Sequence, residues 1–184
     1  TNVVDSEADG NGKSGIYVEG GTVTVDSTSA DSNAEHGILL KGADGSTVTA
    51  VTASTNTLHG VFAEDVVDGV IADSIADDNG DAGFRVHHSD GAVVTNVSAD
   101  GNAHGIHLSS ATTTLNDSTM TANAEGLRLR KHVHTVANVT IESNTQYGLY
   151  LDEPDDNVVR GSRINDSGTA GIYFPDDKPE NNLI

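Results

Sequence analysis

The chain has 184 residues, of which 28 are acidic and 9 are Lys or Arg, so its formal net charge is −19. This length fits one domain, and the absence of cysteine excludes disulfides and thiolate metal sites. The lack of a basic footprint makes nucleic acid a poor partner, and no apolar run is long enough for membrane insertion.

The excess of carboxylates points to a salty habitat. Repulsion among so many like charges opposes a compact state in dilute buffer and is relieved by salt, because the Debye length falls to about 3 Å at 1 M. Asp outnumbers Glu and Lys is scarce, which resembles proteins of halophilic archaea. The alternative is an acidic extracellular domain from an ordinary organism.

A short phrase, glycine followed by apolar, any, apolar residues, recurs along the whole chain at intervals of 21 to 23 residues. Such a steady period predicts a solenoid of about eight coils that stack on one another. The glycines of the phrase are Gly15, Gly37, Gly60, Gly83, Gly105, Gly126, Gly148 and Gly171.

Within each repeat, three apolar or small columns precede the glycine, and no 3.6-residue periodicity occurs. Short β-branched pieces separated by Gly, Asn, Asp and Ser predict strands joined by turns, with three strands per coil. The first column is Val3, Val25, Val48, Ile71, Val94, Leu115, Val136 and Val159. The second is Ser6, Thr28, Val51, Ser74, Val97, Ser118, Val139 and Ser162, and the third is Ala8, Ala30, Ala53, Ala76, Ala99, Met120, Ile141 and Ile164.

A column of asparagines comes three or four residues before the glycines. We expect these residues to adopt the left-handed backbone conformation of a sharp turn, and their amides to form hydrogen bonds from coil to coil. In the last coil Gly168 is expected to take the same place and conformation. The asparagines are Asn11, Asn33, Asn56, Asn79, Asn102, Asn123 and Asn144.

The repeats resemble those of right-handed parallel β-helix proteins of the carbohydrate-binding and sugar-hydrolase type, the pectate-lyase-like superfamily. The likeness rests on repeats of the form Asn, two or three residues, then Gly-Ile-Tyr-Val, and on segments such as 157–164, and it extends over essentially all 184 residues. It implies an all-β, right-handed, single-stranded parallel β-helix. That superfamily includes lyases, epimerases, hydrolases and proteins without activity, so the resemblance leaves the activity open.

We interpret residues 1–184 as a single β-helix domain. Neither end carries a capping helix, although an open coil exposes apolar side chains and strand edges. Two explanations remain: the chain is a segment of a longer protein, or neighbouring domains or subunits cover its ends.

In the glycine strand, the residues one and three after the glycine should point inward and those two and four after it outward. This places basic and aromatic side chains on one face of the later coils, with His88, Lys131, His132 and Glu153 at its rim. Arginine binds carboxylates bidentately and rings stack on sugars, so the face suits an acidic saccharide. The predicted substrate-binding residues are Arg85, His87, His107, Arg128, Arg130, Tyr150 and Tyr173.

Three explanations for this face stay open. The arginines could simply balance nearby carboxylates, they could bind saccharide, or the face could be catalytic with His107, Arg128 and Asp152 as candidates. The signature Asp-Pro-His-Asp of the epimerases and the aspartate trio of polygalacturonases are both missing. A second column, His36, His59 and His104, is expected to consist of turn residues and not of metal ligands.

Two further patterns concern modification and metal. The string 77–81 resembles an oxygen-rich calcium loop with Asp77, Asn79 and Asp81 as ligands, although so acidic a chain produces such strings readily. No other cofactor is expected. Glycosylation sequons occur at Asn96, Asn116, Asn138 and Asn165.

The sequence therefore predicts a structural or saccharide-binding β-helix of a secreted or cell-surface protein from a halophile. The expected partner is a polysaccharide or cell-surface glycan. The competing prediction is a lyase, epimerase or hydrolase that acts on acidic, uronate-containing polysaccharide.

Overall fold

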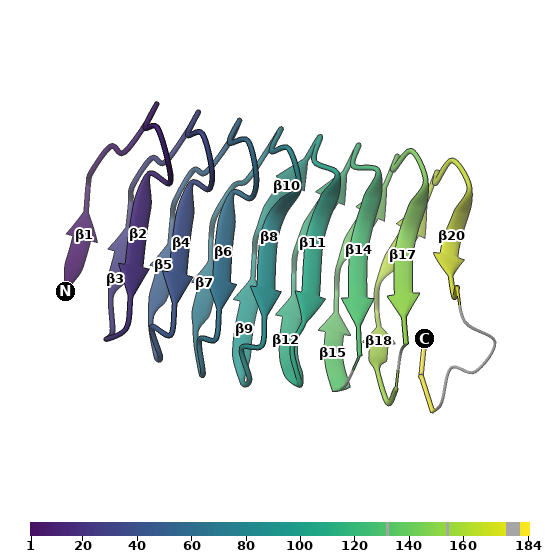
Figure 1. Cartoon of the computed structure of the whole chain (residues 1–184). Helices are drawn as coiled ribbons and strands as arrows, with labels where there is room; N and C mark the ends of the chain where they lie inside the picture. Colours follow the sequence, from purple (N-terminus) through teal and green to yellow (C-terminus); the bar gives the residue numbers. More distant parts are fainter. Residues whose placement is uncertain (132, 154, 176–180) are drawn as a thin grey trace.

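The structure is a computed structural model that describes residues 1–131, 133–153, 155–175 and 181–184. It is a parallel β-solenoid of eight coils, with the coils following one another along a single axis from the N-terminus to the C-terminus (Figure 1). The predicted fold and coil number are confirmed. No helix long and apolar enough to cross a membrane occurs in the described ranges.

Three parallel sheets form the walls. Sheet A, which opens each coil, consists of β1 (Asn2–Val4), β3 (Thr24–Asp26), β5 (Thr47–Thr49), β7 (Val70–Ala72), β9 (Ala92–Thr95), β12 (Thr112–Asn116), β15 (Val133–Ala137) and β18 (Val158–Arg160). Sheet B consists of β10 (Ser98–Asp100), β13 (Thr119–Thr121), β16 (Thr140–Glu142) and β19 (Arg163–Asn165). Sheet C consists of β2 (Ile16–Glu19), β4 (Ile38–Lys41), β6 (Val61–Glu64), β8 (Ala82–His87), β11 (His104–Ser109), β14 (Glu125–Arg130), β17 (Tyr147–Asp152) and β20 (Ala170–Tyr173).

Sheet B is weaker in the first coils than the three-strand prediction assumed. There the wall is reduced to single bridges that run from Glu7 through Ser29, Thr52 and Ile75 to Ser98. The inward residue of this segment is alanine in the first five coils, at Ala8, Ala30, Ala53, Ala76 and Ala99, and β10, which contains Ala99, is only three residues long.

The predicted register is confirmed. Val25, Val48, Ile71, Val94, Leu115, Val136 and Val159 are paired from coil to coil in sheet A and are buried. In sheet C the residues one and three after the glycine face the core, as Leu127, Leu129, Leu149 and Leu151 show with 0 % exposure. One continuous apolar core therefore runs through the stack.

The asparagine column forms the predicted amide ladder. From Asn33 onward these side chains are buried, and each Oδ1 accepts hydrogen bonds from the backbone N and the Nδ2 of the asparagine one coil earlier, at 2.8–3.3 Å. The ladder thus satisfies donors that would otherwise be buried without partners.

The conformation predicted for these asparagines is wrong by one residue. The positive φ angles belong to the residues just before them, Gly10, Ser32, Thr55, Asp78, Gly101, Ala122 and Ser143. The amide must turn inward to join the ladder, so the preceding residue makes the left-handed turn. In the last coil Asp166 has the positive φ, and Ser167 stands where the other coils have asparagine. Gly168 has no positive φ, so the conformation predicted for it is wrong.

Close approach between neighbouring chain segments requires the repeated glycines of the first seven coils, whereas at Gly171 a Cβ would meet only Ile164, at 3.7 Å. A Cβ on Gly105 would lie 2.5 Å from the carbonyl oxygen of Gly126 and 2.8 Å from Nδ2 of Asn123. Backbone cannot yield as a flexible side chain does, so only glycine lets sheet C begin this close to the amide ladder. This tight corner fixes the start of each strand in sheet C, and with it the outward side chains.

Candidate functional site

Three columns of side chains on sheet C point away from the core: one just before the glycine, one two residues after it and one four residues after it. Strand pairing aligns them across β8, β11, β14, β17 and β20. Here we call the predicted set the basic face: Arg85, His87, His107, Arg128, Arg130, Tyr150 and Tyr173. The structure brings these residues onto one wall, as their register predicts.

Two of the three arginines of the basic face are paired with carboxylates. Asp152 Oδ2 lies 3.1 Å from Nη2 of Arg128 and 3.3 Å from Nε of Arg130. Glu125 Oε2 lies 3.7 Å from Nη1 of Arg128. Most of the charge of Arg128 and Arg130 is therefore balanced by neighbouring carboxylates. Asp152, named above as a catalytic candidate, is held between the two arginines.

Arg85 differs from the other two arginines. Its Nη1 is 2.5 Å from Nδ1 of His107, and its guanidinium carbon lies 5.7 Å from the centre of the Phe62 ring. Among the described residues no carboxylate forms an ion pair with it. Burial lowers the pKa of Arg85 from its usual value. Asp81 and Glu64 act on Arg85 only from beyond ion-pair distance, so this half-buried cation, which lacks a direct ion pair, favours an anionic ligand.

His107 belongs to the outward column but is only 7 % exposed. Burial first, and then the charge of Arg85, lower its pKa to about 2, so the imidazole is neutral at ordinary pH. Its Nδ1 accepts from Arg85, which places the proton on Nε2. His107 therefore orients Arg85, and its burial leaves it poorly placed to reach a ligand directly.

The column before the glycine contributes polar residues that the sequence reasoning did not select. His104 lies between two carboxylates: its Nδ1 is 3.1 Å from Glu125 Oε2, and its Nε2 is 3.7 Å from Asp81 Oδ1. Glu125 is 7 % exposed. The sequence predicts His104 only as a turn residue, and the available signal was that Glu125 occupies the same place before the glycine one coil later.

His36 and His59 in the same column have a structural role. The Nδ1 of His36 accepts from the backbone N of His59, and the Nδ1 of His59 accepts from the backbone N of Ala82. Burial lowers the pKa of both rings, that of His59 to about 4. Among the described residues, no group of three or more His, Cys, Asp or Glu is placed to hold a metal ion.

Three tyrosines extend the basic face toward the C-terminus. The rings of Tyr147 and Tyr173 are stacked, with centroids 4.4 Å apart, and Tyr150 contacts both at 5.4 Å. The guanidinium of Arg128 lies 4.6 Å from the centre of the Tyr150 ring. Partly exposed rings beside arginines form a surface on which a sugar ring can stack.

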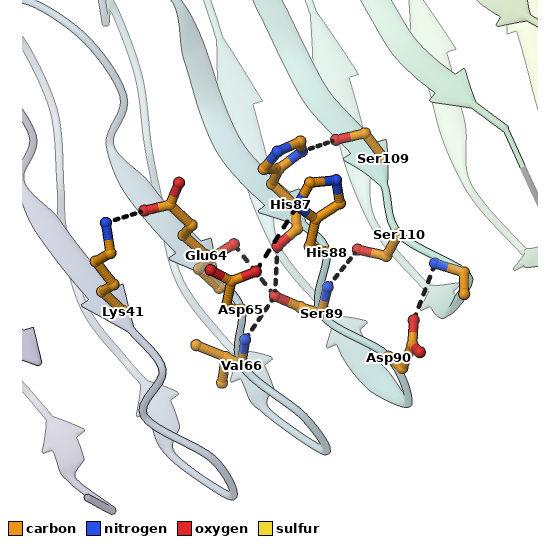
Figure 2. A network of polar contacts seen from close by, with 12 residues as sticks. Lys41, Glu64, Asp65, Val66, His87, His88, Ser89, Asp90, Ser109 and Ser110 are labelled. Atoms are coloured by element: carbon orange, nitrogen blue, oxygen red, sulfur yellow. Dashed lines mark hydrogen bonds and ion pairs between the residues drawn. The ribbon is translucent and has the colours of Figure 1, made fainter. Parts of the chain in front are cut away.

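At the edge of the basic face, where the coils turn from sheet C toward sheet A, lies a cleft of about 320 Å³. Figure 2 shows His87 and His88 next to each other at this turn, with Ser109 beside His87. We call this cleft the histidine cleft. It is lined by His87, His88, Asp90, Ser109, Ser110, Ala111, Arg130 and Lys131. Lys131 also pairs with Glu153 across the predicted rim, and His132 lies outside the described residues.

The calcium and glycosylation predictions fall elsewhere. Asn79 is buried in the amide ladder, where its Oδ1 accepts from Asn56, so it is turned away from the partly exposed Asp77 and Asp81. Of the sequons, Asn96 and Asn138 are exposed at left-handed turns, while Asn116 and Asn165 are partly exposed at strand ends. Calcium binding and glycosylation both stay predictions.

Comparison with known proteins shows the fold. Residues 1–134 match the family described as "Right handed beta helix region". No curated protein matches the chain. Among solved structures, that of a point mutant of the periplasmic alginate epimerase AlgG is similar, with a TM-score of 0.61 and 14% identity. The similarity covers 88% of this chain and 49% of that one, so this chain spans about half the length of the neighbour.

Proposed function

The chain belongs to the right-handed β-helix family, and on that premise we propose that it binds an acidic, uronate-containing polysaccharide along the basic face. The observation that carries the proposal is Arg85, a half-buried guanidinium that has no ion-pair partner among the described carboxylates of a chain with net charge −19. A carboxylate of the polymer would supply the direct ion pair that Arg85 lacks.

The neighbouring side chains support the same ligand class. The stacked Tyr147 and Tyr173, with Tyr150 beside them, offer ring faces to sugars, and these contacts weaken little at high salt. The neighbour with the same fold is named as an alginate epimerase, which gives a polysaccharide ligand a precedent on this fold.

Calorimetric titration with uronate oligosaccharides tests the proposal. We expect Arg85→Ser to weaken binding about tenfold to a hundredfold, because a hydrogen bond to a charged group contributes about 1.5–3 kcal/mol. Arg163→Ser is the matched control, since Arg163 lies on sheet B and pairs with Glu142.

At 2 M salt Tyr150→Ala should cost more affinity than Arg130→Ser, because stacking is screened less than charge. Absence of binding to every acidic oligosaccharide tried would refute the proposal.

A second candidate is an enzyme, a lyase, epimerase or hydrolase, that acts on the same polymer. The favouring observation is His104 between Glu125 and Asp81, with Arg128 close to Glu125, because a base held by carboxylates beside a cation suits proton abstraction next to a carboxylate group. His104 is more exposed than the buried His107. It therefore replaces His107 as the candidate base.

For this candidate, unsaturated uronides released from acidic polysaccharides would be followed by ultraviolet absorbance, and epimerisation by proton NMR. The enzyme candidate expects turnover by the parent protein and its loss in His104→Ala, with Arg163→Ser unchanged. Oligosaccharide binding without turnover would contradict the enzyme candidate and support the binding function only.

The habitat and location form part of the proposal. The charge of −19 supports a halophile, and a polysaccharide ligand supports an extracellular or cell-surface location. Neighbouring domains or subunits would cover the apolar residues exposed near the last coil, Ile172, Leu183 and Ile184.

A further inference from the structure

The histidine cleft contains a set of polar groups whose bonds within the protein are incomplete. Arg130 uses Nε for Asp152 at 3.3 Å, which leaves the two Nη groups of its fork. Asp90 uses Oδ1 to accept from the backbone N of Ala111 at 3.0 Å, which leaves Oδ2. His87 uses Nδ1 for the hydroxyl of Ser109 at 2.8 Å, which leaves Nε2 (Figure 2).

These groups match one particular ligand chemistry. The fork of Arg130 suits a carboxylate, and so does the ammonium of Lys131, which has three donors and pairs with Glu153 Oε2 at 3.4 Å. The remaining oxygen of Asp90 suits a hydroxyl donor. An anion without hydroxyl groups would be repelled by the Asp90 carboxylate and would donate no hydrogen bond to it. A neutral sugar would leave the cations unused. A volume of about 320 Å³ lies at the lower end of ligand-site sizes and fits a small ligand better than a long chain segment.

We propose that the histidine cleft holds a single carboxylated sugar residue, and that His87 gains a proton when the carboxylate binds. This deepens the proposed function and rests on it for the ligand class. It assigns the carboxylate to Arg130, Lys131 and His87, and a sugar hydroxyl to Asp90.

The surroundings of His87 make proton gain the expected response. On its own strand and turn it faces Arg85 and His88, and the ring of His88 lies 3.7 Å from that of His87, centre to centre. The carboxylate of Asp90, on the same turn, lines the cleft with it. From the preceding coil it faces Glu64 and Asp65, and Asp65 is 3.7 Å from Nδ1 of His88.

From the following coils His87 faces the hydroxyl of Ser109 and, across the cleft, the cations Arg130 and Lys131. Burial, followed by His88 and Arg85, lowers the pKa of His87 from its usual value, so the neutral ring predominates in the free protein at pH 7. A bound carboxylate reverses part of this effect, because an opposite charge favours the imidazolium form.

The direction of the pH dependence follows from linkage. The pKa of His87 is higher in the complex than in the free protein, so affinity rises as pH falls through the bound-state pKa and levels off below the free-state pKa. With one proton gained, the rise is at most about tenfold per pH unit.

The experiment titrates the full chain with glucuronate by calorimetry between pH 5 and pH 8, in two buffers of different ionisation enthalpy. We expect binding with uptake of up to one proton, weaker binding of inorganic sulfate and none of glucose. In His87→Gln, which can keep the bond to Ser109, the proton uptake and the rise in affinity at low pH should disappear. In Ala111→Phe, which fills the cleft and leaves its polar groups, glucuronate binding should be lost.

The outcomes separate this inference from the proposed function. Glucuronate binding that survives Ala111→Phe, or proton uptake that survives His87→Gln, overturns the inference while oligosaccharide binding along the basic face can still stand. Binding of oligosaccharides but not of glucuronate overturns it as well. Glucuronate binding with the expected proton uptake, together with oligosaccharide binding that Arg85→Ser leaves unchanged, supports the cleft and contradicts the proposed basic face. Sulfate binding as tightly as glucuronate overturns the sugar assignment.

Discussion

Replacing Leu149 by Asp is expected to unfold several of the later coils. Leu149 is 0 % exposed and stacks between Leu127 and Ile172 in sheet C. An unpaired carboxylate in such a place costs several kcal/mol, which is a large part of the 5–15 kcal/mol that holds a typical domain together. Circular dichroism during heating should show a melting temperature lower by at least about 10 °C, or no transition at all.

Gln146→Asp is the control for Leu149→Asp. Gln146 is exposed in the turn before the same strand, so the same new charge should change stability by less than about 0.5 kcal/mol. Leu149→Ala should lie between the two variants, at about 2–5 kcal/mol. An unchanged melting temperature in Leu149→Asp would show that the inward register of sheet C is wrong.

Folding is expected to depend strongly on salt. The 28 acidic side chains face only 9 Lys and Arg, and two of those cations, Arg128 and Arg130, share one carboxylate, that of Asp152. Salt screens the remaining repulsion, so the melting temperature should rise steeply between 10 mM and 2 M potassium chloride.

Three aspartates allow a matched test of this cause. Asp5, Asp73 and Asp117 occupy left-handed turn positions that Asn96 and Asn138 fill in other coils. Changing all three to Asn removes three negative charges and keeps residues suited to that backbone conformation. The triple variant should need less salt to fold. Equal melting temperatures at both salt concentrations would contradict the halophile proposal.

The repeat made the fold predictable, because eight copies of one phrase report the same environment. Any single strand of three residues is ambiguous, but the columns that contain Val25 and Leu127 could be assigned inward by register alone. The amide ladder was predictable in the same way, since stacked asparagines recur at the coil spacing. The left-handed turn was assigned one residue too late, because the sequence does not show that Asn79 must point inward.

The site was predictable only as a face. The register places Arg85 and His107 side by side, but it does not show that His107 is buried beneath its neighbours. Nor does it show that Asp152 pairs with two arginines, because side-chain direction in an outward column depends on the neighbouring coils. The histidine cleft is formed where a turn meets two later coils. No single repeat contains it.

A crystal structure of the protein with a bound uronate trisaccharide tests the central claim most directly. We predict electron density for the sugar over β8, β11, β14 and β17, with a carboxylate on the guanidinium of Arg85 and a ring against Tyr150. Sugar bound only on sheet A or sheet B, or an empty basic face at a saturating concentration of ligand, would contradict it.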